Sequence, residues 1–119
     1  MSDNLVAEKS RTFALNIIAL FRGLLNVRCP RELASQLLRS GTSIGANIRE
    51  GEMAQSKADF IAKYNIALKE ANETDYWLDL IHSSGYISDH YYCGYQLQCR
   101  EIIYILIAII KKTKENLNR

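Results

Sequence analysis

Basic side chains at helical spacing are the residues of this chain best suited to chemistry. Arg11 and Arg22 are eleven residues apart, which is three turns of an α-helix and places both on one face. Arg39 and Arg49 follow on the outward stripe of a second expected helix. Guanidinium and ammonium groups bind phosphate, so these residues predict contacts with a nucleic-acid backbone. Three lysines near the end of the chain extend the predicted set of phosphate-binding residues: Lys111, Lys112 and Lys114.

Charge patterning supports this prediction without establishing it. Residues 4–49 contain seven Lys or Arg and two acids, whereas residues 50–90 contain eight acids and three lysines. The net charge of the 119-residue chain is only +2, with a pI near 8.4. The basic residues therefore either bind phosphate or only keep a surface hydrated, and the sequence leaves both interpretations open.

Neither metal binding nor catalysis is predicted. Asp79 and His82 have the i,i+3 spacing of ligands in di-iron bundles, but such a site needs a second motif and carboxylates from two more helices. His90, Cys93 and Cys99 match no usual zinc spacing. The sequence has no glycine-rich phosphate loop and no recognisable Ser, His and Asp arrangement. We therefore expect no catalytic residue, no metal and no cofactor.

Four tyrosines near residue 90 allow a second mode of nucleic-acid contact. Their rings could stack on unpaired bases. Aromatic rings at such spacing also pack the end of a helical bundle or a contact between subunits, which is the more common role. The tyrosines concerned are Tyr86, Tyr91, Tyr92 and Tyr95.

Four long helices are predicted to position these residues, at 3–27, 31–52, 56–84 and 88–117. With one proline and six glycines, the chain has few of the turn residues that an all-β fold needs. Pro30 is suited to open a helix, Ser56 followed by Asp59 resembles a capping box, and Gly85 is suited to end a helix. Short connections predict an all-α, antiparallel up-down-up-down four-helix bundle, forming one domain over residues 1–119.

Core positions follow from the periodicity of the two middle helices. The third expected helix has an a/d seam, formed by Phe60, Tyr64, Ala67, Ala71, Thr74, Leu78 and Ile81. The second has a core stripe, formed by Leu33, Leu37, Gly41, Ile44 and Ile48. Beside that stripe, Ala34, Gly41 and Gly45 form a small face that predicts close approach of another helix. A polar stripe faces either water or a hydrogen-bond network between helices or subunits: Gln36, Ser40, Ser43, Asn47 and Glu50.

The first and last helices are too apolar for a lone bundle. Residues 13–21 (FALNIIALF) and 102–110 (IIYILIAII) are apolar nearly all round, and such helices are buried on more than one side. Four helices of one chain cannot cover one another on every face. The surplus predicts self-association, with a core helix that exposes a few isoleucines as the alternative.

The cysteine count, the N-terminal sequence and the length of the apolar runs predict the cellular compartment of the protein. The three cysteines form no CxxC pair, and the N-terminus lacks the pattern of a signal peptide. Residues 102–110 fall short of the roughly 20 apolar residues that span a bilayer. We expect a cytoplasmic protein without a membrane partner.

The segment Ser43-Ile44-Gly45-Ala46-Asn47-Ile48-Arg49-Glu50-Gly51 resembles a known signature. It is similar to the Ser-Ile-Pro-x-Asn-Ile-Ala-Glu-Gly motif of the bacterial four-helix-bundle proteins encoded by intervening sequences in 23S rRNA genes. Residues 56–60, with Phe60, resemble the family's Ser-Lys-Lys-Glu-Phe stretch. Gly45 and Arg49 depart from the motif, which has Pro and Ala there. The signature positions that match are Ser43, Ile44, Asn47, Ile48, Glu50 and Gly51.

The resemblance implies a ring-shaped homo-oligomer, a cyclic homopentamer, and no known catalytic activity. A related accessory protein of diversity-generating retroelements is a basic pentamer that binds nucleic acid and a reverse transcriptase, which serves here as an analogy. The leading hypothesis is therefore a non-enzymatic scaffold associated with RNA or DNA. The alternative is a protein-interaction module, an accessory subunit that binds another protein and no nucleic acid.

Overall fold

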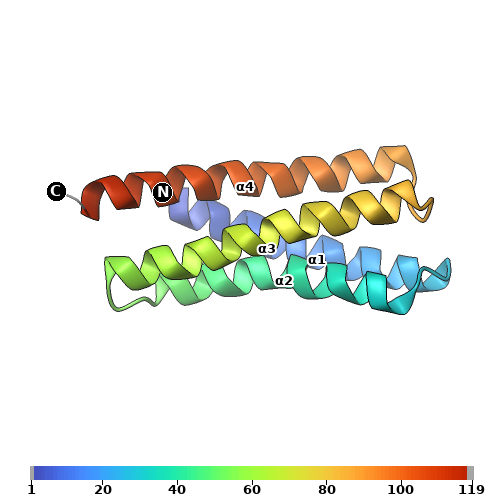
Figure 1. Cartoon of the computed structure of the whole chain (residues 1–119), viewed down its shortest axis with the longest axis horizontal. Helices are drawn as coiled ribbons and strands as arrows, with labels where there is room; N and C mark the ends of the chain where they lie inside the picture. The colour runs from blue at the N-terminus through green and yellow to red at the C-terminus, as the bar shows by residue number, and fades with distance from the viewer. Residues whose placement is uncertain (1, 118–119) are drawn as a thin grey trace.

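The computed structural model describes residues 2–117 of the chain, with side chains from residue 5. Four helices account for nearly all of them: α1 (Ser2–Asn26), α2 (Arg31–Glu52), α3 (Lys57–Ser83) and α4 (Asp89–Leu117). The predicted all-α class is confirmed, because these residues contain four helices and no strand. Figure 1 shows a long molecule in which each helix lies alongside the one before it, with the first and last described residues near one end.

Local sequence explains where the helices begin and end. Pro30 precedes α2 with a φ of −51°, and the Ser56 hydroxyl caps α3 by accepting from the Asp59 N–H at 3.1 Å. Gly85 takes a φ of +87° in the turn between α3 and α4, where an L side chain would be strained. Arg28 adopts a φ of 62° in the turn between α1 and α2.

The core lies along the middle of the four helices. Each helix packs against two others: α1 and α3 both contact α2 and α4. The predicted seam of α3 is buried except at Phe60, which is half-buried and stacks on Tyr64 with ring centroids 4.1 Å apart. In the α2 stripe, Leu33 is half-buried and the other positions are buried.

The other helices bury only part of the apolar surface of α4. Leu106 and its neighbours on one face are buried, whereas Leu97, Tyr104 and Ile107 are exposed. By length and composition alone, α4 is the one described helix apolar enough to cross a bilayer, a test that core helices of soluble proteins pass as well. Residues 102–110, which alone fall short of the roughly 20 residues that span a bilayer, are thus part of a longer apolar helix.

Candidate nucleic-acid interface

Glycines on α2 let α1 approach closely. A Cβ added at Gly41 would lie 2.9 Å from Ile17 Cγ2, and one at Gly45 would lie 3.2 Å from Ser10 Oγ. The predicted small face is confirmed at both glycines, since each faces a residue of α1. A glycine in a helix interior is about 1 kcal/mol less favourable than alanine, and the close packing of α1 against α2 offsets this cost.

A groove with arginines runs along the outer side of this contact. It has a volume of about 550 Å³, and Arg11 from α1 and Arg49 from α2 both line it. Small residues such as Ala14 and Gly45 form part of its lining, and two carboxylates, Glu8 and Glu52, also border it. No ion pair joins either arginine to a carboxylate among residues 5–117. The structure therefore brings together two of the predicted phosphate-binding residues that lie 38 residues apart in sequence.

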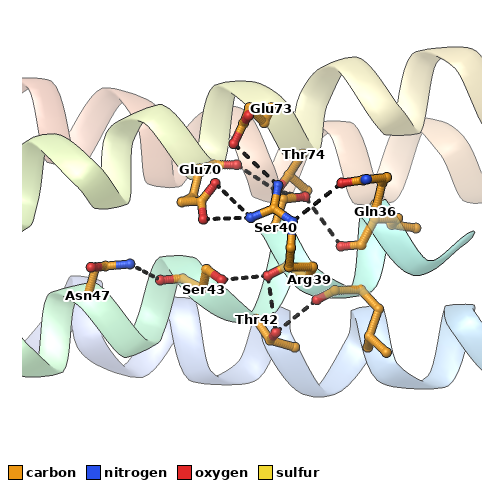
Figure 2. Close-up of polar contacts among 11 residues, drawn as sticks. Gln36, Arg39, Ser40, Thr42, Ser43, Asn47, Glu70, Glu73 and Thr74 are labelled. Carbon is orange, nitrogen blue, oxygen red and sulfur yellow. Dashed lines mark hydrogen bonds and ion pairs between the residues drawn. The ribbon is translucent and has the colours of Figure 1, made fainter. Parts of the chain in front are cut away.

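Arg39 points elsewhere. Its guanidinium faces α3, where Nη1 lies 3.0 Å from Glu70 Oε2 and Nη2 lies 3.6 Å from Glu73 Oε2 (Figure 2). Its Nε donates to Gln36 Oε1 at 3.3 Å. Arg39 thus has two carboxylate partners already, which distinguishes it from Arg11 and Arg49.

The two carboxyl groups beside Arg39 are electrostatically unequal. The Glu70 side chain is only 12% exposed, and burial raises its pKa, with a hydrogen bond to Glu73 acting in the same direction. That hydrogen bond lowers the pKa of Glu73, and the Arg39 guanidinium lowers it further. The arginine therefore stabilises a pair of neighbouring acids, a structural task for a residue predicted to bind phosphate.

The polar stripe of α2 has mixed surroundings. Ser40 is buried and accepts a hydrogen bond from the Thr74 hydroxyl of α3 at 2.9 Å. At this position the stripe takes part in a hydrogen bond between helices, one of the two predicted alternatives. Ser43 and Asn47 instead donate to carbonyls of their own helix, and Glu50 is exposed. The polar stripe of α2 thus contains both a buried residue, Ser40, and an exposed one, Glu50.

The remaining predicted basic residues lie outside the groove. Arg22 is exposed on α1, and so are Lys111, Lys112 and Lys114 in the last turns of α4. Arg31 is also exposed, and it lies eighteen residues or five helical turns from Arg49 on the same face of α2, but it does not line the groove.

Most signature residues have packing roles. Ile44 and Ile48 are fully buried, and a Cβ at Gly51 would lie 2.6 Å from two ring carbons of Tyr64. Phe60 stacks on the same ring. Several residues of the motif therefore determine how the end of α2 packs against the start of α3.

The residues weighed for metal binding have other partners. His82 Nε2 lies 2.6 Å from Asp89 Oδ1, and the imidazole stacks on Tyr92 with ring centroids 4.0 Å apart. Cys99 donates to the Ala71 carbonyl at 3.3 Å, and burial raises its pKa to about 12. The described residues contain no group of three or more His, Cys, Asp or Glu side chains arranged to hold a metal.

The tyrosine cluster mostly packs against the bundle. Tyr86, Tyr92 and Tyr95 are half-buried against the core, and only Tyr91 is exposed. Burial raises the pKa of the Tyr95 phenol. This arrangement fits the packing role better than a row of rings open to bases.

Comparison with known proteins agrees with the signature. The model of the 23S rRNA-intervening sequence protein family matches residues 2–108. The chain belongs to this family. A crystal structure of a protein with unknown function from the S23 ribosomal protein family of Bacteroides thetaiotaomicron is 53% identical, with a TM-score of 0.91 over 93% of this chain and 99% of that one. No curated protein matches the chain.

Membership in the 23S rRNA-intervening sequence protein family confirms the resemblance read from residues 43–60. It brings no established activity, since the solved relative is itself described as having unknown function.

Proposed function

We propose that this chain is a non-enzymatic binding and scaffold protein that contacts the phosphate backbone of RNA or DNA. One observation carries the proposal: Arg11 and Arg49 line a single groove, and neither has a carboxylate partner among the described residues. Arg39 and Arg100, by contrast, are paired with acids of α3. Unpaired guanidinium groups on a surface are free to bind phosphate oxygens.

The protein acts, in this proposal, as a homopentameric ring of antiparallel up-down-up-down bundles in the cytoplasm. Support for assembly comes from the apolar side chains that α3 and α4 leave exposed. A closed ring presents the groove once per subunit. Weak phosphate contacts then add, which compensates for a net charge of only +2 per chain. Arg22, Lys111, Lys112 and Lys114 provide further basic surface, whereas Arg39 is a weaker candidate because of its acidic partners.

Fluorescence anisotropy with labelled structured RNA and duplex DNA, across a salt series, tests this function. The logarithm of the binding constant should fall linearly as the logarithm of salt concentration rises, with a slope of about −0.9 per phosphate bound on a duplex. Arg49→Gln should weaken binding to every sequence and make the slope shallower by about 1 for each phosphate that the variant no longer binds. Arg100→Gln is the matched control, since it removes the same charge from an arginine already paired with Asp75. Equal effects of both variants would contradict the groove assignment.

A protein-interaction module is the second candidate, and a specific surface favours it. A shallow apolar hollow on α3 includes Tyr76 and Trp77, residue types enriched at protein interfaces. Absence of binding to either nucleic acid at low salt would favour this candidate over the first.

A further inference from the structure

The groove between α1 and α2 contains carboxylates as well as arginines. Glu8 on α1 and Glu52 on α2 line it, and each lies three residues from one of the two groove arginines. Like Arg11 and Arg49, both carboxylates are exposed. None of these four side chains takes part in an ion pair within residues 5–117. Carboxylates repel phosphate, so a ligand that is only a polyanion makes poor use of this groove.

The packing of the two helices explains why the four side chains share one groove. Gly41 faces Ile17 and Gly45 faces Ser10, so α2 runs antiparallel to α1 and its last turns approach the start of α1. Three residues rise about 4.5 Å along a helix, so each helix places an acid and an arginine within about one turn of each other. A ligand that fits this arrangement carries an anionic group close to hydrogen-bond donors.

A nucleotide in a single strand carries both kinds of group. Its phosphate binds guanidinium groups, and the Watson–Crick edge of its unpaired base offers N–H donors to a carboxylate. In a duplex those donors are already paired, and the remaining base edges are read by an element that enters a groove of the nucleic acid. Here the carboxylates line a hollow of the protein, so the strand has to enter the protein, as a splayed-out base can.

The chemistry of the base edges favours guanine. Guanine presents its N1–H and its N2 amino group side by side, so one carboxylate can accept both hydrogen bonds. Adenine and cytosine present an amino group beside an acceptor, and uracil presents one N–H between two acceptors. Small lining residues such as Ala14 and Ala46 leave space for a flat ring beside the arginines, whose guanidinium planes stack on bases.

We infer that this groove binds single-stranded nucleic acid at guanine, with phosphates on Arg11 and Arg49 and the guanine edge on Glu8 or Glu52. The inference rests on the proposed function for nucleic-acid binding, and it adds which form of nucleic acid and which base the groove recognises. It also gives the two carboxylates a role that phosphate binding alone does not.

Three labelled RNA probes of equal charge separate base recognition from phosphate binding. The first is an oligouridine of about 12 nucleotides, the second has guanine at every third position, and the third has inosine in place of each guanine. Inosine lacks only the N2 amino group. A duplex of the same length is the fourth probe. Fluorescence anisotropy at one salt concentration measures the binding of each probe to wild type and to the double variant Glu8→Gln with Glu52→Gln.

The matched control is the double variant Glu32→Gln with Glu115→Gln. Both of its carboxylates are exposed and lie outside the groove, so it makes the same change of charge elsewhere on the chain. Substitutions at exposed positions should leave both double variants folded, which circular dichroism checks.

We expect wild type and the control to bind the guanine strand at least about fivefold more tightly than the inosine strand, oligouridine or the duplex, the lower end of a two-donor base contact. The groove variant should lose this preference: its affinity for the guanine strand falls, whereas its affinity for oligouridine stays equal or rises because two charges that repel phosphate are gone.

Other results overturn the inference and show whether the proposed function survives. If the groove variant binds guanine and uridine strands more tightly by the same factor, the carboxylates only repel phosphate; phosphate binding stands and base recognition fails. If wild type binds the duplex as tightly as the guanine strand, or the inosine strand equally well, the groove does not read an unpaired guanine. If wild type binds none of the four probes, the proposed function fails and the inference fails with it.

Discussion

Gly51 offers the sharpest test of how the family signature works. Gly51 is buried in the last turn of α2, and an added Cβ would lie 2.6 Å from Cδ1 and Cε1 of Tyr64. The Tyr64 ring is fully buried and stacked on Phe60, so it cannot turn aside without disturbing the core. We expect Gly51→Ala to destabilise the protein.

The magnitude follows from two opposed effects. Overpacking a core costs roughly 1–3 kcal/mol, and alanine regains up to about 1 kcal/mol of helix propensity, which is less near a helix end. The net loss for Gly51→Ala is therefore about 1–2 kcal/mol. Gly23 is the control, because nothing lies within 4 Å of an added Cβ there, and Gly23→Ala should gain up to about 1 kcal/mol.

Urea unfolding followed by circular dichroism measures both changes at one chain concentration, since assembly makes stability concentration-dependent. The free energies of unfolding of the two variants should differ by about 1–3 kcal/mol, with Gly51→Ala below wild type and Gly23→Ala above it. If Gly51→Ala were as stable as Gly23→Ala, the signature glycine would have no packing role, and the reasoning from Tyr64 would be refuted.

Three further predictions concern single side chains. At pH 8 a maleimide should label exposed Cys93 readily and Cys99 only after unfolding, because burial raises the pKa of Cys99 to about 12; equal labelling rates would contradict its burial. Arg39→Met should lower the free energy of unfolding by about 1–2 kcal/mol in urea titrations, because it leaves the largely buried Glu70 without its cation. Ser56→Ala should cost about 1 kcal/mol by the same measurement through loss of the α3 cap, and Ser56→Asp, which keeps an acceptor, should restore it.

The helices were predictable because their signals are local. Pro30, Ser56 and Gly85 mark helix ends through backbone properties of single residues, and the observed bounds of α2 agree with the prediction. α3 begins one residue later than expected, since Ser56 is the cap and lies outside the helix.

The candidate site was only partly predictable. The spacing of Arg11 on its own helix predicts phosphate binding, yet its position beside Arg49 in one groove depends on how α1 and α2 align. Arg39 looked equivalent to Arg49 because both lie toward the outside of α2. Its partner Glu70 is 31 residues away on α3, a distance at which periodicity carries no information.

The all-α class, the four helices, the buried stripes and the family were predictable from the sequence alone, because each depends on periodicity or on a contiguous motif. Which arginines are paired and which line a groove became clear only from the packed helices. The same is true of the apolar side chains of α4 that remain uncovered. The physical reason is that charge pairing and burial depend on the rotation and register of neighbouring helices, which only packing sets.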